Sequence, residues 1–375
     1  MSTRRWRLRQ RYAWSSEGGR WAALHGRWDS RPGRRYPRQF RSTSVPGDGA
    51  SVAYHGLPEG PTYALPHLFD RQRQRCASPV AVRELPARRW PELTTTTADL
   101  LVVGCSARQA ARLPRERALV LPFRINLVID VDPDVEVMRR RISGNERRQF
   151  AKLRRQYEWE WETSTDPEDL AWFYERMHQP TMAGRHGEGT RSTDLDTAAE
   201  CLFARGHLFF VAEGGKRVAG VLCRRDDGTG TLTMRLLGVL DGDETHYRSG
   251  AVKAVYYLAM EWACANGIRR LDLSGGEPFP GTGVFQFKRR FHPTVTLPED
   301  HFHDKRLWLR IGRDTPAVRD LLVDVPFFAM DATGGLEVVY FGDANRPART
   351  DLRAGAGLSG TRTIDLDEFL AGAPT

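Results

Sequence analysis

The alternation of apolar and polar positions is most regular between residues 157 and 238, where it has the two-residue period of half-buried strands. Aromatic and acidic side chains alternate over residues 157–162, and apolar runs follow over residues 207–213, 218–224 and 231–238. Gly214 and Gly215 separate the first two apolar runs, which predicts a hairpin. The pattern therefore predicts one strand followed by a meander of three antiparallel strands.

Helical signals lie between and after these strands. Pro167 opens an apolar-periodic stretch that runs to Met177, as proline does in the first turn of a helix, and a short helix is predicted over residues 195–204. A longer helix is predicted over residues 250–266, ended by Gly267 and followed by a strand over residues 268–273. Hairpins are antiparallel and helical crossovers usually return parallel, so the predicted fold is α/β with a mixed sheet flanked by helices.

The rest of the chain has weaker periodicity. Short apolar strands are predicted over residues 98–104, 118–123 and 125–130, and strand-like runs recur over residues 307–311 and 336–341. We expect four segments: a basic, aromatic N-terminal arm over residues 1–45, a supporting α/β module over 46–133, the main domain over 134–296, and a C-terminal extension over 297–375.

The net charge of +9 is concentrated at the N-terminus. Residues 1–41 hold twelve arginines and two acidic residues, while the remainder of the chain is close to neutral. A second basic cluster spans residues 139–155, where Ser143 and Glu146 have the spacing of a capping box that opens a helix. Both clusters are candidates for contact with the phosphates of a nucleic acid; a solvent-exposed arm and a solvated helix face are the alternatives.

Cysteine spacing and hydropathy restrict the class of protein. The five cysteines are far apart and form no CxxC pair, which argues against a zinc site and against a disulfide framework. Cys105 follows a glycine turn but has no histidine motif beside it, so it is expected to be a buried thiol. No apolar stretch approaches the roughly 20 residues of a membrane helix. We expect a metal-free protein that is not a membrane protein and that resides in the cytoplasm.

The order of these elements resembles a GNAT acyltransferase domain, and short motifs near its end resemble the Fem-like branch in particular. These motifs are Tyr247-Arg-Ser-Gly-Ala, a helix with Tyr256, Glu261 and Trp262, Arg270-Leu-Asp-Leu-Ser-Gly-Gly276, and Gly283-Val-Phe-Gln-Phe-Lys-Arg-Arg-Phe291. The branch contains aminoacyl-tRNA-dependent peptidyltransferases and bacterial acetyltransferase-like proteins. The resemblance covers residues 140–295 well and residues 46–130 loosely, which implies a degenerate, GNAT-like N-terminal module.

The resemblance implies a catalytic role for Lys288. Acyl transfer to an amine passes through a tetrahedral oxyanion, which requires positioned donors rather than a covalent nucleophile. In Fem-like enzymes the lysine of a Phe-Lys pair is credited with stabilising this charge, and here that pair is Phe287-Lys288. The aromatic residues Phe285, Phe287 and Phe291 flank the lysine. An exposed cation within an arginine and lysine run is the alternative.

The turn before the long helix is the expected donor-binding segment. Arg248, Ser249, Gly250 and Ala251 lie where a GNAT domain binds the pyrophosphate of coenzyme A with the backbone N–H groups of a helix start. The usual family signature is shortened here to one glycine. A thioester such as acyl-CoA and an aminoacyl-tRNA therefore both remain possible donors, and Ser249 as a helix cap is an alternative.

The remaining candidates concern the acceptor, which we expect to be a small-molecule or peptide amine. A carboxylate or imidazole must remove a proton from this amine, and Asp272 and Glu277 are the candidates for that role. Tyr247, Tyr256, Gly275, Gly276, Phe285 and Phe287 are expected to line the pocket. Gly276 lies in a glycine-proline loop that has neither the order nor the ending of a nucleotide-binding signature, so a loop that walls the acceptor pocket is predicted.

Three functions are consistent with these residues. The first is an acyltransferase that moves an acetyl or similar group from acyl-CoA to an amine. The second is an aminoacyl-tRNA-dependent peptidyltransferase, favoured by the two basic clusters. The third, from another class, is a catalytically inactive nucleic-acid-binding protein, against which the intact Phe287-Lys288 pair argues. The oligomeric state is not indicated by the sequence.

Overall fold

The chain forms two compact units in the computed structural model. The structure describes residues 3–372 with the exception of residues 32, 46, 69–73, 75, 91, 93–96 and 187–191. The first unit comprises residues 1–13, 127–274 and 288–294, and the second unit comprises residues 14–126, 275–287 and 295–375. The chain passes between the units several times, so neither unit is one continuous segment.

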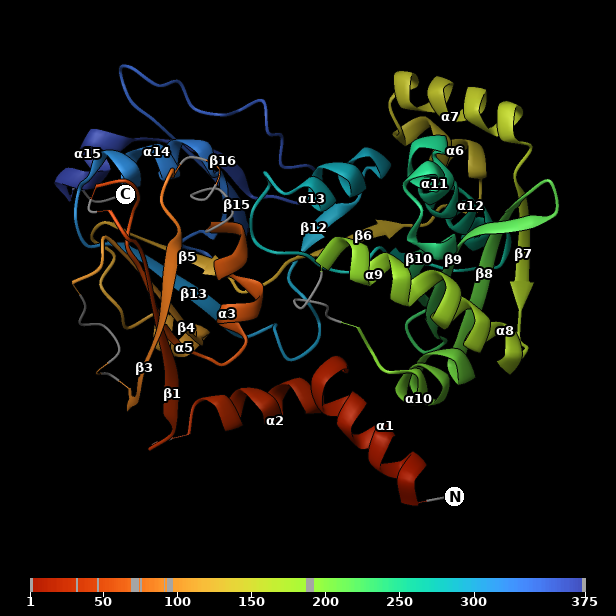
Figure 1. Cartoon of the computed structure of the whole chain (residues 1–375), viewed down its shortest axis with the longest axis horizontal. Coiled ribbons are helices and arrows are strands. Elements are labelled where there is room, and N and C mark those ends of the chain that lie inside the picture. The colour runs from red at the N-terminus through yellow and green to blue at the C-terminus, as the bar shows by residue number, and fades with distance from the viewer. Residues whose placement is uncertain are drawn as a thin grey trace. The chain divides into compact units, whose positions relative to one another are not determined.

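The first unit is built on a seven-stranded mixed sheet (Figure 1). Its strand order is β12 (Thr294–Thr296), β6 (Asn126–Asp130), β11 (Arg270–Asp272), β10 (Thr231–Val239), β9 (Lys216–Asp226), β8 (Gly206–Glu213) and β7 (Glu160–Ser164). The pairs from β10 to β7 are antiparallel, and β10 and β11 are parallel. The predicted meander and the parallel return after the long helix are both confirmed.

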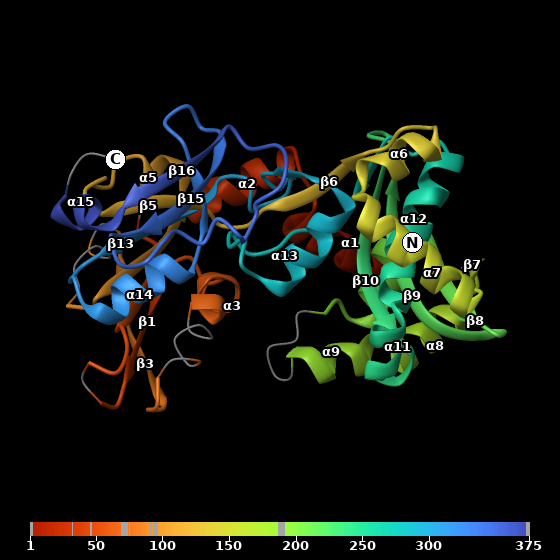
Figure 2. The same cartoon turned by 90° about the horizontal axis from the view of Figure 1, so that it is seen from above.

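Helices cover both faces of this sheet, because successive side chains of a strand point to opposite faces (Figure 2). Phe210 packs in a cluster with Leu170 and Phe173 of α8 (Pro167–Phe173), whereas Phe209 contacts Trp262 of α12 (Ala251–Ala265). The α8 face also carries the π-helix η2 (Tyr174–His178) and α9 (Gln179–His186). The α12 face carries α6 (Val135–Arg141) and α7 (Gly144–Tyr157).

Shorter helices complete the first unit. They are α1 (Thr3–Ser16), α10 (Leu195–Thr197), η4 (Ala198–Leu202), η5 (Phe203–Arg205), η6 (Leu240–Gly242), α11 (Glu244–Ser249) and η7 (Arg289–Phe291). Of α1, the residues up to Ala13 belong to this unit. Several predicted boundaries are confirmed: Pro167 occupies the first turn of α8, Ser143 caps α7, and Gly267 adopts a positive φ after α12. The strand predicted from residue 157 begins later, because Tyr157 ends α7.

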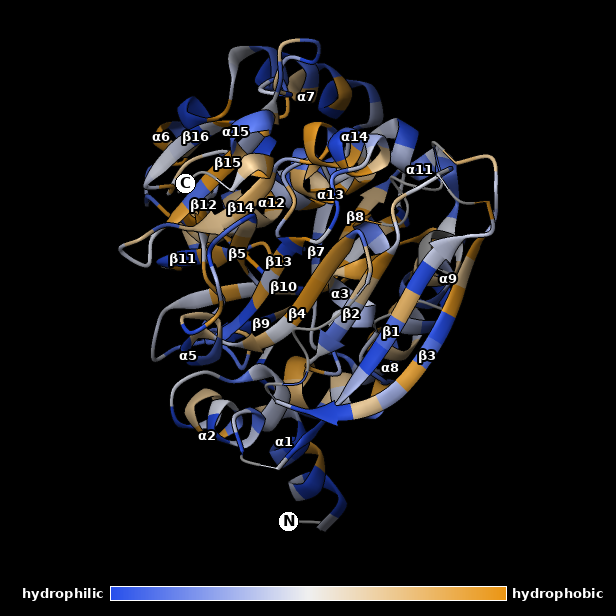
Figure 3. Cartoon of the chain, turned by 90° about the vertical axis from the view of Figure 1, so that its left-hand side faces the viewer, coloured by the Kyte–Doolittle hydropathy of each residue, from blue (hydrophilic) through white to orange (hydrophobic). Residues whose placement is uncertain are grey.

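The second unit contains a six-stranded sheet in the order β3 (Val80–Arg89), β1 (Arg35–Thr43), β2 (Val52–Gly56), β4 (Leu100–Ser106), β13 (Lys305–Ile311) and β5 (Ala118–Pro122). Every residue of β4 is buried, which fits its apolar colour in Figure 3. Only the β2–β4 pair is parallel among the five strand pairs of this sheet. This sheet is therefore mixed as well.

A smaller sheet and short helices surround the six-stranded sheet. The smaller sheet consists of β14 (Phe327–Met330), β15 (Leu336–Gly342) and β16 (Gly360–Asp365). The helices are α2 (Arg20–Asp29), α3 (Gly60–Tyr63), α5 (Ala107–Ala110), α14 (Pro316–Asp324) and α15 (Leu366–Ala371), and α13 (Gly283–Lys288) carries the chain back to the first unit. One apolar core unites these elements, with Trp308 and Phe327 among its fully buried side chains.

The observed units differ from the four segments expected from the sequence. Residues 297–375 are not an appended extension, because β13 lies between β4 and β5 and hydrogen-bonds to both. Residues 46–133 therefore cannot complete their own sheet. In addition, β6 pairs with β11 of the first unit, although the sequence boundary at residue 133 assigned it to the supporting module. Pairing between strands that are distant in sequence causes both differences.

The N-terminal segment is also not a free arm. Residues 3–16 and 20–29 form α1 and α2, and residues 35–43 form an inner strand of the six-stranded sheet. Tyr12 is buried in the first unit, where Arg4 and Arg9 form ion pairs with Asp196 and Glu200. The aromatic residues of this basic segment thus include two side chains of the protein interior, Tyr12 and Tyr36.

Within the described part of the chain, none of the helices combines the length and the apolar character needed to cross a membrane.

Candidate functional site

The parallel pair in the first unit separates partway along β10. The register pairs Thr231 with Arg270 and ends at Thr233 with Asp272, whereas β10 continues to Val239. Beyond this point β9 is the only neighbouring strand of β10 among the strands described. Backbone groups of the last residues of β10 therefore require partners other than β11. This part of β10 is the first feature of the candidate site.

Lys288 lies at the end of β11. Its side chain is 8% exposed, and its ammonium donates hydrogen bonds to the carbonyl oxygens of Leu273 at 2.6 Å and of Ser274 at 3.3 Å. The alternative of an exposed cation in a charged run is therefore wrong. The position gives Lys288 a structural task, which is to hold the end of the strand. Its predicted oxyanion role stays a prediction.

The Asp272 side chain binds the same segment, the residues that follow β11. Its carboxylate accepts a hydrogen bond from the backbone N–H of Ser274 at 2.8 Å, and the Ser274 hydroxyl donates to the carbonyl of Met234 on β10. Ser274 has a φ of 64°, a left-handed conformation that is uncommon for a residue other than glycine. The fold thus brings two predicted catalytic residues, Lys288 and Asp272, to one strained strand end. Strain of this kind is often found at functional sites.

The expected donor-binding turn is largely buried. Gly250 has a φ of 90° and joins α11 to α12, and Ala251 is fully buried. A methyl group on Gly250 would lie 3.0 Å from Leu153 of α7 and 3.5 Å from Trp159, so these side chains cover the turn. Arg248 is the only exposed residue of the four. The burial leaves little room for a pyrophosphate at this turn, and the assignment stays a prediction.

Ser249 does not cap α12. Its hydroxyl donates to the carbonyl of His246 at 3.1 Å, and the residue before α12 is Gly250, which offers no side-chain cap. The helix-cap alternative for Ser249 is therefore wrong. The physical reason is that α11, a helix absent from our sequence prediction, ends at Ser249 and takes its hydroxyl.

Two predicted pocket residues, Tyr247 and Tyr256, belong to α11 and α12. Tyr256 is 8% exposed and stacks on Phe291 with ring centroids 5.1 Å apart. Burial raises the pKa of its hydroxyl, and the neighbouring Tyr247 acts in the same direction. Tyr247 is half-buried. The phenol of Tyr256 is thus kept in the neutral form.

Five other predicted residues belong to the second unit: Gly275, Gly276, Glu277, Phe285 and Phe287. A methyl group on Gly275 would lie 2.4 Å from the carbonyl of Ile125, whereas one on Gly276 would meet open space. Gly276 forms a two-bond bridge with Ile125. The close approach that requires glycine is therefore at Gly275, and the predicted role of Gly276 in a loop that walls the acceptor pocket stays a prediction. Phe285 packs on Phe328 in the same unit.

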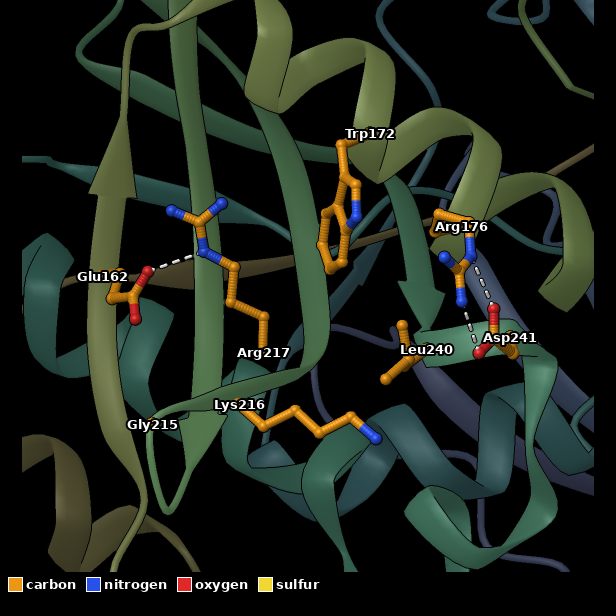
Figure 4. A pocket seen from close by; sticks show the side chains of 8 residues that line it. All are labelled: Glu162, Trp172, Arg176, Gly215, Lys216, Arg217, Leu240 and Asp241. Carbon is orange, nitrogen blue, oxygen red and sulfur yellow. Dashed lines mark hydrogen bonds and ion pairs between the residues drawn. The ribbon is translucent and has the colours of Figure 1, made fainter.

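A cavity of about 580 Å³ lies in the first unit, and sequence reasoning missed it (Figure 4). Its lining residues are Glu162, Trp172, Arg176, Gly215, Lys216, Arg217, Leu240 and Asp241. Carboxylates engage both arginines, since Arg176 pairs with Asp241 at 2.8 Å and Arg217 pairs with Glu162 at 2.8 Å. The Lys216 side chain extends across the opening in Figure 4. The cavity is polar enough to hold a small charged molecule.

The basic side chains over residues 139–155 fall into two groups, those that form ion pairs within the unit and those that are exposed to solvent. Arg139 and Arg154 bind Glu261 of α12 and so fasten α6 and α7 to the unit. The outward side chains Arg147, Arg148, Lys152 and Arg155 of α7 are exposed. No described hydrogen bond or ion pair engages these four. We call them the α7 basic face. A solvated helix face and a surface for phosphates are both consistent with this geometry.

Metal and thiol chemistry were the remaining possibilities considered from the sequence. Among the described residues, no group of three or more histidine, cysteine or acidic side chains could hold a metal ion. Burial raises the pKa of the Cys105 thiol to about 12, so the thiolate is absent near neutral pH and the expectation of a buried thiol is confirmed.

Comparison with protein families identifies the domain. Residues 139–289 match the acetyltransferase (GNAT) domain family, and this segment contains the meander, the β10–β11 pair and Lys288. These residues form a GNAT domain, which confirms the fold expected for this part of the chain. The match covers less than half of the chain. None of the curated proteins matches the sequence.

Several solved structures are similar at low identity. L-PGS from Bacillus licheniformis is 12% identical with a TM-score of 0.38, and the alignment covers 84% of this chain and 94% of that one. FemX is 11% identical with a TM-score of 0.39 and coverages of 83% and 96%. An aminoglycoside acetyltransferase from an uncultured soil metagenomic sample is 15% identical with a TM-score of 0.23 and coverages of 31% and 75%. Similarity at this level indicates no substrate.

Proposed function

We propose that this protein is an N-acyltransferase that moves an acetyl or similar acyl group from a thioester such as acyl-CoA to an amine. The observation that carries the proposal is the position of Lys288 within the GNAT domain. Its ammonium lies at the end of β11, next to the point where the pairing of β10 with β11 ends. An acyl carbonyl beside this part of β10 would develop its negative charge close to that cation.

The residues around Lys288 would hold the end of β11 in place and keep water away from the ammonium. Asp272 and Ser274 fix the strand end, so the lysine does not have to reorganise when charge develops. The stacked rings of Tyr256 and Phe291 form an apolar cluster within the same unit. No covalent nucleophile is required, because the amine attacks the acyl carbon directly.

The test is a comparison of transfer with binding. Purified protein is incubated with acetyl-CoA and with L-lysine, spermidine and kanamycin as amine probes, and released CoA thiol is measured. We expect turnover with at least one probe and thermal stabilisation by acetyl-CoA. Absence of both effects would reject the thioester donor.

A second candidate, the Fem-like function, transfers the acyl group from an aminoacyl-tRNA. Two observations favour it: the expected pyrophosphate turn is covered by Leu153 and Trp159, and the α7 basic face is exposed. Arg148, Lys152 and Arg155 are three to four residues apart and so lie along one side of the helix. We propose that this face contacts RNA phosphates. The exposed arginines of residues 3–41 would add to this contact.

Matched charge variants test the RNA contact. R148Q/K152Q/R155Q removes three charges from the α7 basic face, and R83Q/R88Q/R89Q removes three exposed charges from β3. We expect only the first variant to weaken binding of bulk aminoacyl-tRNA, with a shallower dependence of log Kd on log salt concentration. Equal losses in both variants would indicate non-specific attraction, and tRNA binding without any transfer would favour the inactive nucleic-acid-binding protein.

The five cysteines are free thiols, as is usual in a reducing compartment. We therefore propose a cytoplasmic location. Detection of a stable disulfide in the purified native protein would contradict it.

A further inference from the structure

His178 is a buried histidine that belongs to no motif of the sequence. It ends the π-helix η2 on the α8 face of the first unit and is 2% exposed. Its Nδ1 lies 2.9 Å from the carbonyl oxygen of Leu237 on β10, and its Nε2 lies 2.6 Å from the hydroxyl oxygen of Ser192. Ser192 is exposed to solvent. The imidazole thus connects an exposed hydroxyl to the backbone of the central strand.

The hydrogen bonds fix the tautomer of a neutral imidazole. A carbonyl oxygen can only accept, so Nδ1 must carry the proton that is donated to Leu237. Nε2 of the neutral ring is then an acceptor. The Ser192 hydroxyl has two acceptors within reach, Nε2 at 2.6 Å and the carbonyl of Thr193 at 3.2 Å, and its single proton is assigned to the shorter contact. A hydroxyl that donates to an imidazole, itself oriented by a third group, is the arrangement that activates hydroxyl groups in enzymes.

The position of this pair on β10 connects it with the proposed site. Leu237 lies in the part of β10 that β11 no longer accompanies, three residues beyond Met234, which accepts the Ser274 hydroxyl. Three residues of strand span about 10 Å. The residues bound to Lys288 and the imidazole of His178 therefore contact the same short part of β10, which has no β11 neighbour.

The fold requires this close approach of η2 to β10. A methyl group on Gly238 would lie 2.5 Å from the carbonyl carbon of Met177 and 2.7 Å from the backbone nitrogen of His178, so only glycine allows it. One turn later, Thr181 accepts a hydrogen bond from the backbone N–H of Val239 at 2.9 Å. Side chains of η2 and α9 thus replace strand pairing as partners of this backbone.

We propose that Ser192 and His178 form the proton relay that deprotonates the acceptor amine in this GNAT domain. The inference rests on the proposed acyl transfer and supplies its general base, in place of Asp272 or Glu277. Asp272 is engaged with the Ser274 backbone, and Glu277 belongs to the second unit. Ser192 is the group that touches the substrate, and His178 acts through it.

In the proposed step the amine nitrogen forms a bond to the acyl carbon. One proton of the nitrogen moves to the Ser192 oxygen while the hydroxyl proton of Ser192 moves to Nε2 of His178, which becomes an imidazolium. The bond between the acyl carbon and the leaving group then breaks, and the electron pair leaves with the sulfur of the thioester or the oxygen of the charged RNA. The imidazolium proton returns through Ser192 to that leaving group, so the relay is regenerated.

The surroundings of His178 suit a base. Burial lowers its pKa below the usual value of about 6.5, opposed by the hydrogen bond to Leu237, so the ring is neutral near pH 7. Among the described side chains, the Tyr174 ring lies 5.6 Å from the imidazole, and Arg176 on the same helix is paired with Asp241. A neutral base loses its function as the pH falls through its pKa.

The tautomer can be tested without any substrate. Long-range proton–nitrogen NMR spectra of the histidine-labelled full chain should show His178 protonated on Nδ1, with a pKa below 6.5. Ser192→Ala should shift the Nε2 resonance and leave Nδ1 protonated. Protonation on Nε2, or a pKa at the ordinary value, would overturn the relay irrespective of what the protein transfers.

The second experiment follows the pH dependence of acyl transfer. With acetyl-CoA and the amine probes, or with aminoacyl-tRNA, His178→Gln should lower kcat by about 10²–10⁴. It should also remove the loss of activity at low pH, and imidazole should restore part of kcat. Thr181→Val, which removes the neighbouring bond to β10 but no titratable group, should lower the melting temperature and keep the wild-type pH profile.

The outcomes separate the inference from the function on which it rests. An unchanged pH profile in active His178→Gln protein would reject the relay and keep the acyltransferase. An acyl group found on Ser192 by mass spectrometry would also reject it, in favour of a covalent nucleophile. If wild-type protein transfers nothing from either donor, the proposed function fails and the relay fails with it, whatever tautomer the NMR spectra show.

Discussion

Each unit of this protein buries a lysine, and the partners of the two lysines differ. In the second unit Lys305 is 2% exposed, and its ammonium forms ion pairs with the carboxylates of Asp29 and Glu59. In the GNAT-containing unit Lys288 is 8% exposed, and it donates to two peptide carbonyls. Lys253 of the first unit resembles Lys305, since it is buried and pairs with the carboxylate of Glu146. The comparison shows that Lys305 ties together segments that are distant in sequence, whereas the two carbonyls place Lys288 at the end of β11, where its catalytic role stays a prediction.

The histidines extend this contrast. His178 in the first unit bonds one backbone carbonyl and one exposed hydroxyl. His25 in the second unit pairs with Asp29, and His301 lies against His25 with ring centroids 4.8 Å apart. The two histidines of the second unit thus lie among other titratable side chains, whereas His178 binds a backbone carbonyl of β10 and a hydroxyl.

The largest expected effect is on folding. Lys305→Met removes one partner of the buried Asp29, which keeps Arg34, and also removes the ammonium paired with the half-buried Glu59, so the free energy of unfolding should fall by about 3–5 kcal/mol. Denaturation with urea measures the loss. A loss below about 1 kcal/mol would mean that the two buried lysines do not differ as we describe.

Lys288→Ala should affect turnover more than folding. If the ammonium serves the oxyanion, kcat should fall by about 10²–10³. Acyl transfer under saturating donor measures this effect, and far-UV circular dichroism verifies the fold. The matched control is Lys216→Ala, a lysine of the cavity in the same unit, which should leave kcat unchanged. An unchanged rate in the Lys288 variant would remove its assignment.

Gly275 and Gly276 provide a pair of adjacent substitutions. Gly275→Ala should destabilise the protein by about 1–3 kcal/mol, because its methyl group would clash with the carbonyl of Ile125, whereas Gly276→Ala should change little. Thermal denaturation of both variants measures the difference. Equal effects would show that the loop does not approach β6 as described.

The smallest expected effect is the acid sensitivity of the second unit. Burial, Lys305 and His25 lower the pKa of His301 to about 3, and Arg124 acts in the same direction while Asp29 opposes it. The unfolded chain, with a pKa of about 6.5, binds the proton more readily, so stability falls as the pH is lowered below 6.5. The loss should be about 1.4 kcal/mol for each pH unit. His301→Phe should reduce this slope, as urea denaturation at pH 6.5 and 5.5 would show.

Much of the first unit could be predicted from the sequence. The meander, Pro167 at the start of α8, Ser143 as the cap of α7 and the parallel return into β11 all follow from local periodicity and capping, which act between residues close in sequence. The position of Lys288 near a strand end also followed, but through the resemblance to a family. Its partners Leu273 and Ser274 could not be predicted, because every residue has a backbone carbonyl and the sequence does not show which of them bind the lysine.

The sequence could not predict His178 as part of a site. A lone histidine in a helical stretch is ordinary, and its importance depends on Ser192 and on Leu237, which lies 59 residues away. The position of β13 between β4 and β5 could not be predicted either, because about half the chain separates β13 from these two strands in the sequence.

By itself, then, the sequence determined the local elements of the GNAT domain and the presence of the Phe287-Lys288 pair after its last strand, because periodicity, caps and short motifs depend on neighbouring residues. Only the tertiary structure decided which segments complete each sheet, that Leu153 and Trp159 cover the turn at Gly250, and that His178 reaches β10. Those features arise from long-range strand pairing and close packing, in which the partner of a residue is fixed by the whole fold.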